Sequence, residues 1–359
     1  MRARAMEGTC LATLVRMAIP LCRAAERQCP RAGPGRPPDF PDWVMAVLIM
    51  TAVLKKKKSK SAQYRFLREH RRAFRHWLDL EGFPSRTTYF DRYRRCHRLL
   101  EVAIRVQGER AVAEGIARPQ TVAVDKSLVA ARGPLWHKKD RAAGRIPNRL
   151  RGVDRDSTWG YSEHHGWVQG YSYETVATAT EGSTVFPLLA SADTASMKEF
   201  ASFEPKIDHL PEDTENVLAD TGYDKNAFGD RIECDQPGRR TKRRFICPPN
   251  SRNSKDGRRA SWPRAKRIPP APRCRREKRI AFYRSRRGQR LYARRGQTVE
   301  PFNDWFKVLF ELDERTWHRG LDNNRTQMLA ALFGYQLLVR YNHRRGRENG
   351  QIKWILDQL

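Results

Sequence analysis

Hydrophobic side chains in residues 41–118 recur at three- and four-residue intervals, the spacing of one face of an α-helix. The pattern predicts three helices: Trp43–Leu54, Ser61–Leu80, and a third that opens at Ser85 and runs toward Ala113. Three Arg-rich helices with a Gly/Pro-containing turn suit a helix-turn-helix-like DNA-binding domain over residues 39–118. A plain basic helical bundle that packs on the next domain is the alternative.

The pattern changes at residue 119, where short apolar runs and alternating segments replace the helical spacing. Strands are expected at Thr121–Leu128, Gly166–Thr180, Val185–Leu189 and Asn216–Asp220, with a helix at Thr194–Phe203. A strand meander followed by a helix and another strand is typical of the α+β class. We therefore expect an α+β domain over residues 119–345, closed by helices from Val299 onward, of which Met328–Val339 is the most apolar.

Three segments fall outside this pattern. Residues 1–38 end in a run rich in Pro, Gly and Arg, and we expect a poorly ordered extension whose removal leaves folding and DNA binding intact. Residues 230–290 are basic and rich in Arg, Pro and Ser, which predicts a solvated insertion or a groove for nucleic acid. Residues 346–359 form a C-terminal tail.

Charge narrows the possible partners. The chain has 359 residues and a formal charge of +30, from 70 Lys and Arg against 40 Asp and Glu. Such an excess favours polyanions, of which DNA and RNA are the commonest. An acidic membrane surface competes, but the longest apolar stretch, Val44–Leu54, is far shorter than the ~20 residues of a spanning helix. The seven cysteines lack zinc-type spacing and predict reduced thiols in the cytoplasm.

Three acidic residues stand where carboxylates from distant positions can converge. Asp125 and Asp220 each end an apolar run, and Glu300 opens an amphipathic segment. Alone, an Asp at a strand end caps a turn, and a Glu at a helix start complements the helix dipole. Together, in a basic chain, they are typical of a site that holds divalent ions against a nucleic-acid phosphate. Four further acids are reserve candidates: Asp154, Asp156, Asp193 (expected to cap a helix) and Asp224.

Five short motifs resemble the DDE transposases of bacterial insertion sequences. They are Ala123–Ser127, Gly166–Tyr171, Leu218–Asp224, Tyr292–Lys307, and Trp317–Leu321 with Ala331–Leu337. Together they span roughly residues 119–342 in the order that the family has.

The resemblance implies an RNase H-like mixed sheet flanked by helices, with a basic helical domain before it. It implies catalytic acids at Asp125, Asp220 and Glu300 that hold two Mg²⁺ ions, with Mn²⁺ able to substitute. The expected partners are double-stranded DNA, as element ends and target, and a second copy of the chain in a homodimer. The expected location is the nucleoid of a bacterial cytoplasm.

The family also has a signature of Tyr, Arg, Glu and Lys on its last catalytic helix. Tyr292, Arg295, Glu300 and Lys307 match it, with one extra residue between Arg295 and Glu300. The resemblance implies DNA contacts for Tyr292, Arg295 and Lys307. An ordinary surface lysine is the alternative for Lys307.

The function implied is cleavage of element ends followed by strand transfer into target DNA. Two alternatives stay open. A metal-dependent nuclease would use the same acids and stop after hydrolysis. A basic DNA-binding protein without catalysis, such as a decayed transposase copy, would tolerate loss of any one acid.

Overall fold

The computed structural model describes residues 10–29, 38–148, 150–163, 166–233, 243–250, 275–347 and 352–359. Its strands are β1 (Thr121–Ala130), β2 (Thr158–Ser162), β3 (Gly166–Thr178), β4 (Pro187–Thr194), β5 (Asn216–Leu218) and β6 (Arg244–Ile246). The helices of the first third are α2 (Cys10–Gln28), α3 (Asp42–Leu54), α4 (Lys60–Glu69), α5 (Arg71–Leu78), α6 (Arg86–Arg95) and α7 (His97–Ala113). The later ones are α8 (Lys138–Ala142), α9 (Glu199–Phe203), α10 (Asn226–Glu233), α11 (Arg275–Arg284), α12 (Arg286–Leu309), α13 (Leu321–Arg344) and α14 (Lys353–Gln358), with 3-10 turns η1 (Glu204–His209) and η2 (Thr221–Tyr223).

The strands form one mixed sheet in the order β2-β3-β1-β5-β6, and β4 pairs with β3 on the same edge as β2. β1 and β3 are antiparallel, whereas β1, β5 and β6 are parallel. Residues 169–178 of β3 are buried throughout, because both faces of the sheet are covered. The expected α+β class and RNase H-like mixed sheet flanked by helices are confirmed.

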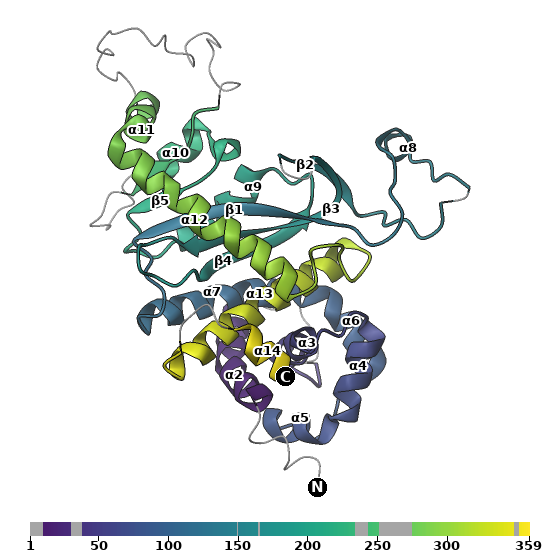
Figure 1. The fold of residues 1–359 in the computed structure, drawn as a ribbon. Helices are drawn as coiled ribbons and strands as arrows, with labels where there is room; N and C mark the ends of the chain where they lie inside the picture. The colour runs from purple at the N-terminus through teal and green to yellow at the C-terminus, as the bar shows by residue number, and fades with distance from the viewer. Residues whose placement is uncertain are drawn as a thin grey trace, which may run out of the picture.

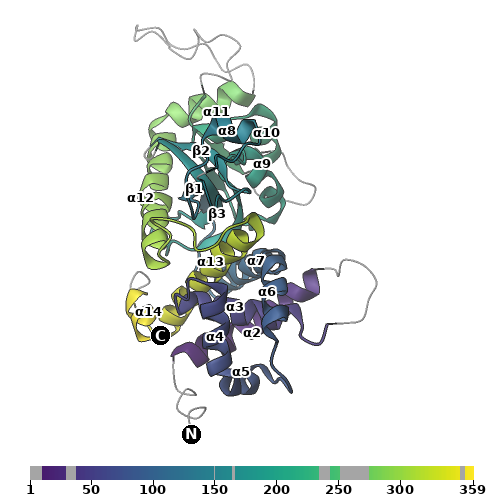
Figure 2. The same cartoon turned by 90° about the vertical axis from the view of Figure 1, so that its right-hand side faces the viewer.

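Helices cover the two faces of the sheet differently. On one face α12 packs its Val299 against Ala123 of β1 and Leu218 of β5. Val122, Val124 and Val217, which alternate with these residues along the strands, belong to the larger core on the opposite face. Figure 2 shows α12 on one side of the strands and α9 and α10 on the other, with α7 and α13 below.

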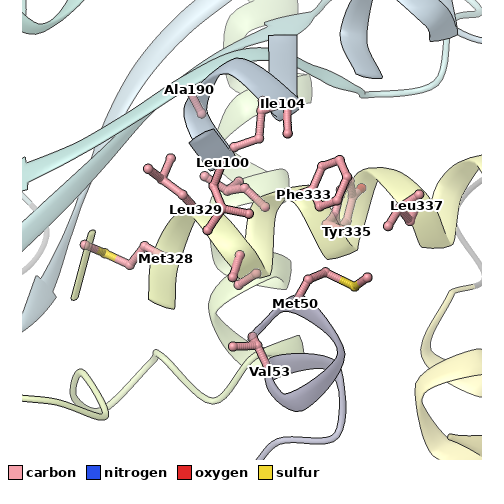
Figure 3. Close-up of a cluster of buried hydrophobic side chains, with 14 of the residues drawn as sticks. Met50, Val53, Leu100, Ile104, Ala190, Met328, Leu329, Phe333, Tyr335 and Leu337 are labelled. Atoms are coloured by element: carbon pink, nitrogen blue, oxygen red, sulfur yellow. The ribbon is translucent and has the colours of Figure 1, made fainter. Parts of the chain in front are cut away.

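Helix α13 lies at the centre of the larger core. It is buried along nearly its whole length and contacts α7 and β4 on one side and α3 on the other. Figure 3 shows Phe333 of α13 among Met50 of α3, Leu100 and Ile104 of α7, and Ala190 of β4. The N-terminal helices therefore share one core with the sheet, although the sequence predicts a boundary near residue 118. A DNA-binding role for residues 39–118 stays a prediction.

The expectation of a poorly ordered segment over residues 1–38 is wrong for Cys10–Gln28. These residues form α2, which packs against α3 and α7. Its apolar residues recur at helical spacing, and Leu14, Val15 and Ala18 are fully buried. Arg16 and Arg23 lie on the exposed face. Residues 1–9 and 30–37 lie outside the described residues.

Other boundaries also differ from the sequence predictions. The second and third predicted helices are each divided in two, as α4 with α5 and α6 with α7. The region 230–290 is not wholly an insertion, because its apolar residues Phe245 and Ile246 form β6 and are buried beside β5. Residues 234–242 and 251–274 lie outside the described residues. The tail contains α14, which buries Ile355 and Leu356.

None of the helices that the structure describes is both long enough and apolar enough to cross a bilayer. The most apolar, α3, has 13 residues and is enclosed by other helices.

Candidate active site

The parallel pairing of β1 with β5 places two of the three predicted acids side by side. The register runs from Thr121 opposite Asn216 to Ala123 opposite Leu218. Continued for two residues, it sets Asp125 opposite Asp220. Side chains alternate along a strand, so both carboxylates project toward the face that α12 covers.

Helix α12 brings the third acid to the same place. Glu300 lies within the helix rather than at its start, as the sequence suggested, because α12 begins at Arg286. The neighbouring Val299 holds this part of the helix on the sheet. The three acids that the sequence singled out therefore converge at one end of β5.

The Arg295 guanidinium connects the three carboxylates. One terminal nitrogen is hydrogen-bonded to Asp125 and lies 3.9 Å from Oδ2 of Asp220, and the other lies 3.1 Å from Oε1 of Glu300. The extra residue between Arg295 and Glu300 does not prevent this contact, since the two side chains still meet across α12. Arg295 thus places a positive charge at the point on which the acids converge.

The side chains of the three acids differ in how deeply they are buried. The side chain of Asp125 is 13% exposed, that of Asp220 36% and that of Glu300 53%. Burial raises the pKa of Asp125 to about 6; Arg295 opposes the shift, and Asp220 and Glu300 add to it. Burial also raises the pKa of Asp220. Among the three acids, Asp220 and Glu300 are therefore the more accessible to a phosphate group.

Asn303 completes the surroundings of Asp125. It lies one turn beyond Glu300 on α12 and donates a hydrogen bond of 2.6 Å from Nδ2 to Oδ2 of Asp125. Asn303 is buried, and its Oδ1 has no hydrogen-bond partner in the described part of the chain. Both oxygens of Asp125 are thus held by α12, one by Arg295 and one by Asn303.

A buried polar network fixes the loop that carries Asp220. Asp220 accepts a hydrogen bond of 2.8 Å from the backbone N–H of Gly222. The next residue, Tyr223, donates from its hydroxyl to Glu174 of β3 at 2.7 Å, and Glu174 is paired with buried Lys206 at 2.8 Å. This network joins the loop after β5 to the central strand and limits how far Asp220 can move.

Sequence reasoning missed Glu199, a fourth carboxylate beside the site. It begins α9, where an acid ordinarily complements the helix dipole, so nothing in the sequence distinguished it. A Cβ on Gly222 would lie 1.5 Å from Oε2 of Glu199 and 3.1 Å from Oδ1 of Asp220, so glycine leaves the space that this carboxylate fills. Burial and the neighbouring Asp220 raise the pKa of Glu199 to about 7.

Two further signature residues lie around the acids. Tyr292 stands one turn before Arg295 on α12 and packs edge-on against Tyr283, with ring centroids 5.2 Å apart. Burial raises its pKa to about 12. Lys307 is buried and only 9% exposed, so as placed here it offers no open surface to a DNA phosphate. Burial lowers its pKa, an effect that Asp304 and Asp125 oppose.

The sequence also matches the family model of the transposase DDE domain, over residues 116–337, more than half of the chain. The chain belongs to the DDE transposase family. Among solved structures it is similar to piggyBac transposase in a cryo-EM synaptic complex with hairpin DNA, at 11% identity and a TM-score of 0.39. That match covers 96% of this chain and 76% of the other. No curated protein matches the chain.

The reserve acids of this transposase have structural partners instead. Asp154 and Asp156 accept hydrogen bonds from the backbone N–H groups of Gly320 and Leu321 at the start of α13. Asp193 lies in β4 and pairs with Arg325, so it does not cap a helix as expected. Asp224 pairs with Arg276 of α11 at 2.7 Å.

The donor set of the transposase site fits a hard divalent cation. Such ions prefer carboxylate oxygens, and three carboxylates already surround the positive charge of Arg295. In the described part of the chain, however, no three acidic, histidine or cysteine side chains are grouped tightly enough to hold an ion as they stand. Arg295 separates the acids, so ion binding requires its guanidinium to move.

The raised pKa values predict how stability of the metal-free transposase depends on pH. Glu199 has a folded pKa of about 7 against a usual 4.5, and Asp125 about 6 against 3.8. At a pH between the usual pKa and the folded pKa of each group, the folded protein binds more protons than the unfolded chain. The free energy of unfolding therefore falls as pH rises through that range. We expect the melting temperature in EDTA to fall from pH 5 to pH 8, and Glu199→Gln to flatten that fall. The exposed control Glu215→Gln should keep the wild-type slope, and equal slopes in all three proteins would contradict the assignment.

Proposed function

We propose that the chain is a DNA transposase that cleaves element ends and transfers the freed strand into target DNA, with Asp125, Asp220 and Glu300 as its catalytic acids. The observation that carries the proposal is the convergence of these carboxylates on the Arg295 guanidinium, within the region that matches the family model. The formal charge of +30 suits a protein that must hold DNA at more than one place.

Each side chain has a distinct part in this proposal. Asp125, Asp220 and Glu300 would hold two Mg²⁺ ions, which activate the attacking oxygen and stabilise the leaving oxygen when bound. Asn303 fixes one oxygen of Asp125 and orients the carboxylate. Tyr223 and Glu174 restrain the loop of Asp220. Water attacks the phosphorus, and the bond between phosphorus and the 3′ oxygen breaks to leave a 3′-OH and a 5′-phosphate. The freed 3′-OH then attacks a phosphodiester of target DNA, whose own bond between phosphorus and the 3′ oxygen breaks to leave a 3′-OH on the target strand.

DNA and a second copy of the chain are the proposed partners. Pairing two element ends requires two sets of catalytic acids, and the family resemblance implies a homodimer. The described surface supports DNA through its charge, because many arginines of α4, α5 and α6 are exposed.

The experiment is a cleavage and joining assay on a supercoiled donor plasmid that carries the element's own ends. It compares Mg²⁺, Ca²⁺ and no divalent ion. The proposal predicts joined products in Mg²⁺ alone. Nicking without joining would identify a nuclease, and DNA binding without either reaction would identify a non-catalytic protein.

The position of Arg295 predicts an unusual response to divalent ions. Arg295→Gln removes the positive charge that the carboxylates share, so the metal-free variant should melt at a lower temperature than wild type. Mn²⁺ should then raise the melting temperature of the variant more than that of wild type, because no guanidinium competes with the ion. Thermal unfolding with and without Mn²⁺ measures both effects, with the exposed Arg290→Gln as control. A smaller ion-induced shift in Arg295→Gln than in wild type would contradict this view of the site.

A further inference from the structure

A polar cavity lies where the N-terminal helices meet the catalytic region. Its volume is about 330 Å³, and it is lined by Lys60, Arg132, Trp317, His318, Arg319 and Asn323. Lys60 begins α4, Arg132 follows β1, and the other residues lie before and at the start of α13. Three separate parts of the chain therefore contribute to one cavity.

Three cations line this cavity without a carboxylate partner. Among the described residues, no Asp or Glu oxygen lies within ion-pair distance of Lys60, Arg132 or Arg319. Neutral oxygens hold two of them instead. Lys60 donates to Oδ1 of Asn323 at 3.1 Å, and Arg132 donates to the backbone carbonyl of Trp317 at 2.7 Å. These two cations are thus held by neutral oxygens, and Asp91 is near enough to Lys60 to act on it electrostatically.

Two glycines lie against the Arg319 guanidinium. Gly152 and Gly133 both have positive φ angles, of 75° and 114°. A Cβ on Gly152 would lie 2.6 Å from Nη2 of Arg319, and one on Gly133 would lie 3.7 Å from its Nε. The backbone conformation at position 152 favours glycine, and a side chain there would displace the Arg319 guanidinium.

The pKa of His318 is affected by the same positive charges. It is buried in the wall of the cavity, and its Nε2 lies 3.0 Å from the hydroxyl of Tyr93. Burial, then Lys60 and Arg132, lower its pKa to about 3, so the imidazole is neutral. A neutral ring can line an anion site without adding a charge of its own.

We propose that this cavity is a phosphate-binding site that holds a backbone phosphate of the DNA duplex, remote from the catalytic acids. Lys60 and Arg132, which an amide and a carbonyl oxygen hold in place, and Arg319 together provide three cations for the oxygens of one phosphodiester. Because α4 and the residues around α13 both contribute, the bound phosphate would connect the N-terminal helices to the catalytic region. This inference rests on the proposed function, since it takes DNA as the ligand.

The length of β1 gives the approximate distance between the cavity and the catalytic acids. Asp125 lies five residues before Ala130, where β1 ends, so the cavity side of the strand is ~16 Å from the acid at about 3.3 Å per residue. The cavity is therefore separate from the site that the catalytic acids form.

Two measurements on the full chain test the cavity. Thermal unfolding with inorganic phosphate, against NaCl at equal ionic strength, reports anion binding. Fluorescence anisotropy with a 30-base-pair duplex over a range of salt concentrations reports how many phosphates are contacted. We expect phosphate to stabilise wild type but not Arg319→Gln. We also expect Arg319→Gln and Lys60→Gln each to lower the slope of log K against log salt by about 0.9.

The control is Arg118→Gln, an exposed arginine before the opposite end of β1. Gly152→Ala is a second test, because it keeps every charge and should lose phosphate stabilisation by displacing Arg319. If phosphate stabilises wild type but Arg319→Gln leaves the salt slope of DNA duplex binding unchanged, the DNA assignment is overturned. It is also overturned if Arg319→Gln changes the salt slope of an RNA duplex and not that of the DNA duplex. Equal behaviour of Arg319→Gln and Arg118→Gln in both measurements would overturn the site. Failure of strand joining in the plasmid assay, with these effects intact, would count against the transposase function and not against the cavity.

Discussion

Asp220→Asn is expected to reduce strand cleavage and joining by about 10²–10³-fold while duplex DNA binding persists. Asparagine keeps the shape of the side chain but removes the charge that a divalent ion requires. The remaining acids then hold an ion less tightly and out of position, and loss of a single electrostatic contact in a catalytic site costs about 10²–10³-fold in rate. Asp220 is less buried than Asp125, so its replacement should disturb the fold less.

Asp213→Asn is the matched control for this prediction. Asp213 lies seven residues earlier on the same segment and is exposed. Its replacement removes the same charge from the chain and should leave cleavage unchanged. Cleavage by Asp220→Asn at a rate near that of Asp213→Asn would remove Asp220 from the catalytic site.

The second large effect concerns α2, which the sequence alone assigns to a dispensable extension. Leu14 is fully buried against the core that α3 and α7 share with the sheet. Leu14→Ala should lower the free energy of unfolding by about 2–5 kcal/mol, the range for a buried leucine that leaves a cavity. Deletion of residues 1–28 should yield no soluble folded protein, because it exposes the apolar surface that α2 covers. Denaturant unfolding measures the first effect, and soluble yield the second.

Arg16→Ala provides the comparison for α2. Arg16 lies on the exposed face of the same helix, so this variant should unfold within about 0.5 kcal/mol of wild type. A soluble truncation that melts like the full chain would restore the interpretation of residues 1–38 as an appendage.

The proximity of the three candidate acids could be predicted from the sequence, because their placement follows from local pattern and strand geometry. Asp125 and Asp220 each follow a short apolar run, and parallel strands that start in register bring the residues after them together. Glu300 was singled out because it opens an amphipathic segment and matches the family signature, although its helix begins at Arg286, 13 residues before the expected start at Val299. The α+β class followed from the change of period at residue 119.

The remaining features depend on contacts between distant segments. Glu199 begins a short helix and resembles any dipole-complementing acid until the backbone sets it against Gly222. α2 could not be distinguished from a loose extension, because its arginines interrupt the apolar run when read linearly and separate onto one face only in a helix. The meeting of Arg295 with all three acids, despite the extra residue in the signature, depends on how α12 crosses the sheet.

Calorimetric titration of Mn²⁺ into the full chain tests the central claim most directly, which is that Asp125, Asp220 and Glu300 form one divalent-cation site. It compares wild type, Asp220→Asn and Asp213→Asn, each checked for folding by thermal unfolding. The account predicts saturable binding in wild type and in Asp213→Asn, with at least a tenfold weaker affinity in Asp220→Asn, or about 1.4 kcal/mol. Equal affinity in all three folded proteins would contradict it.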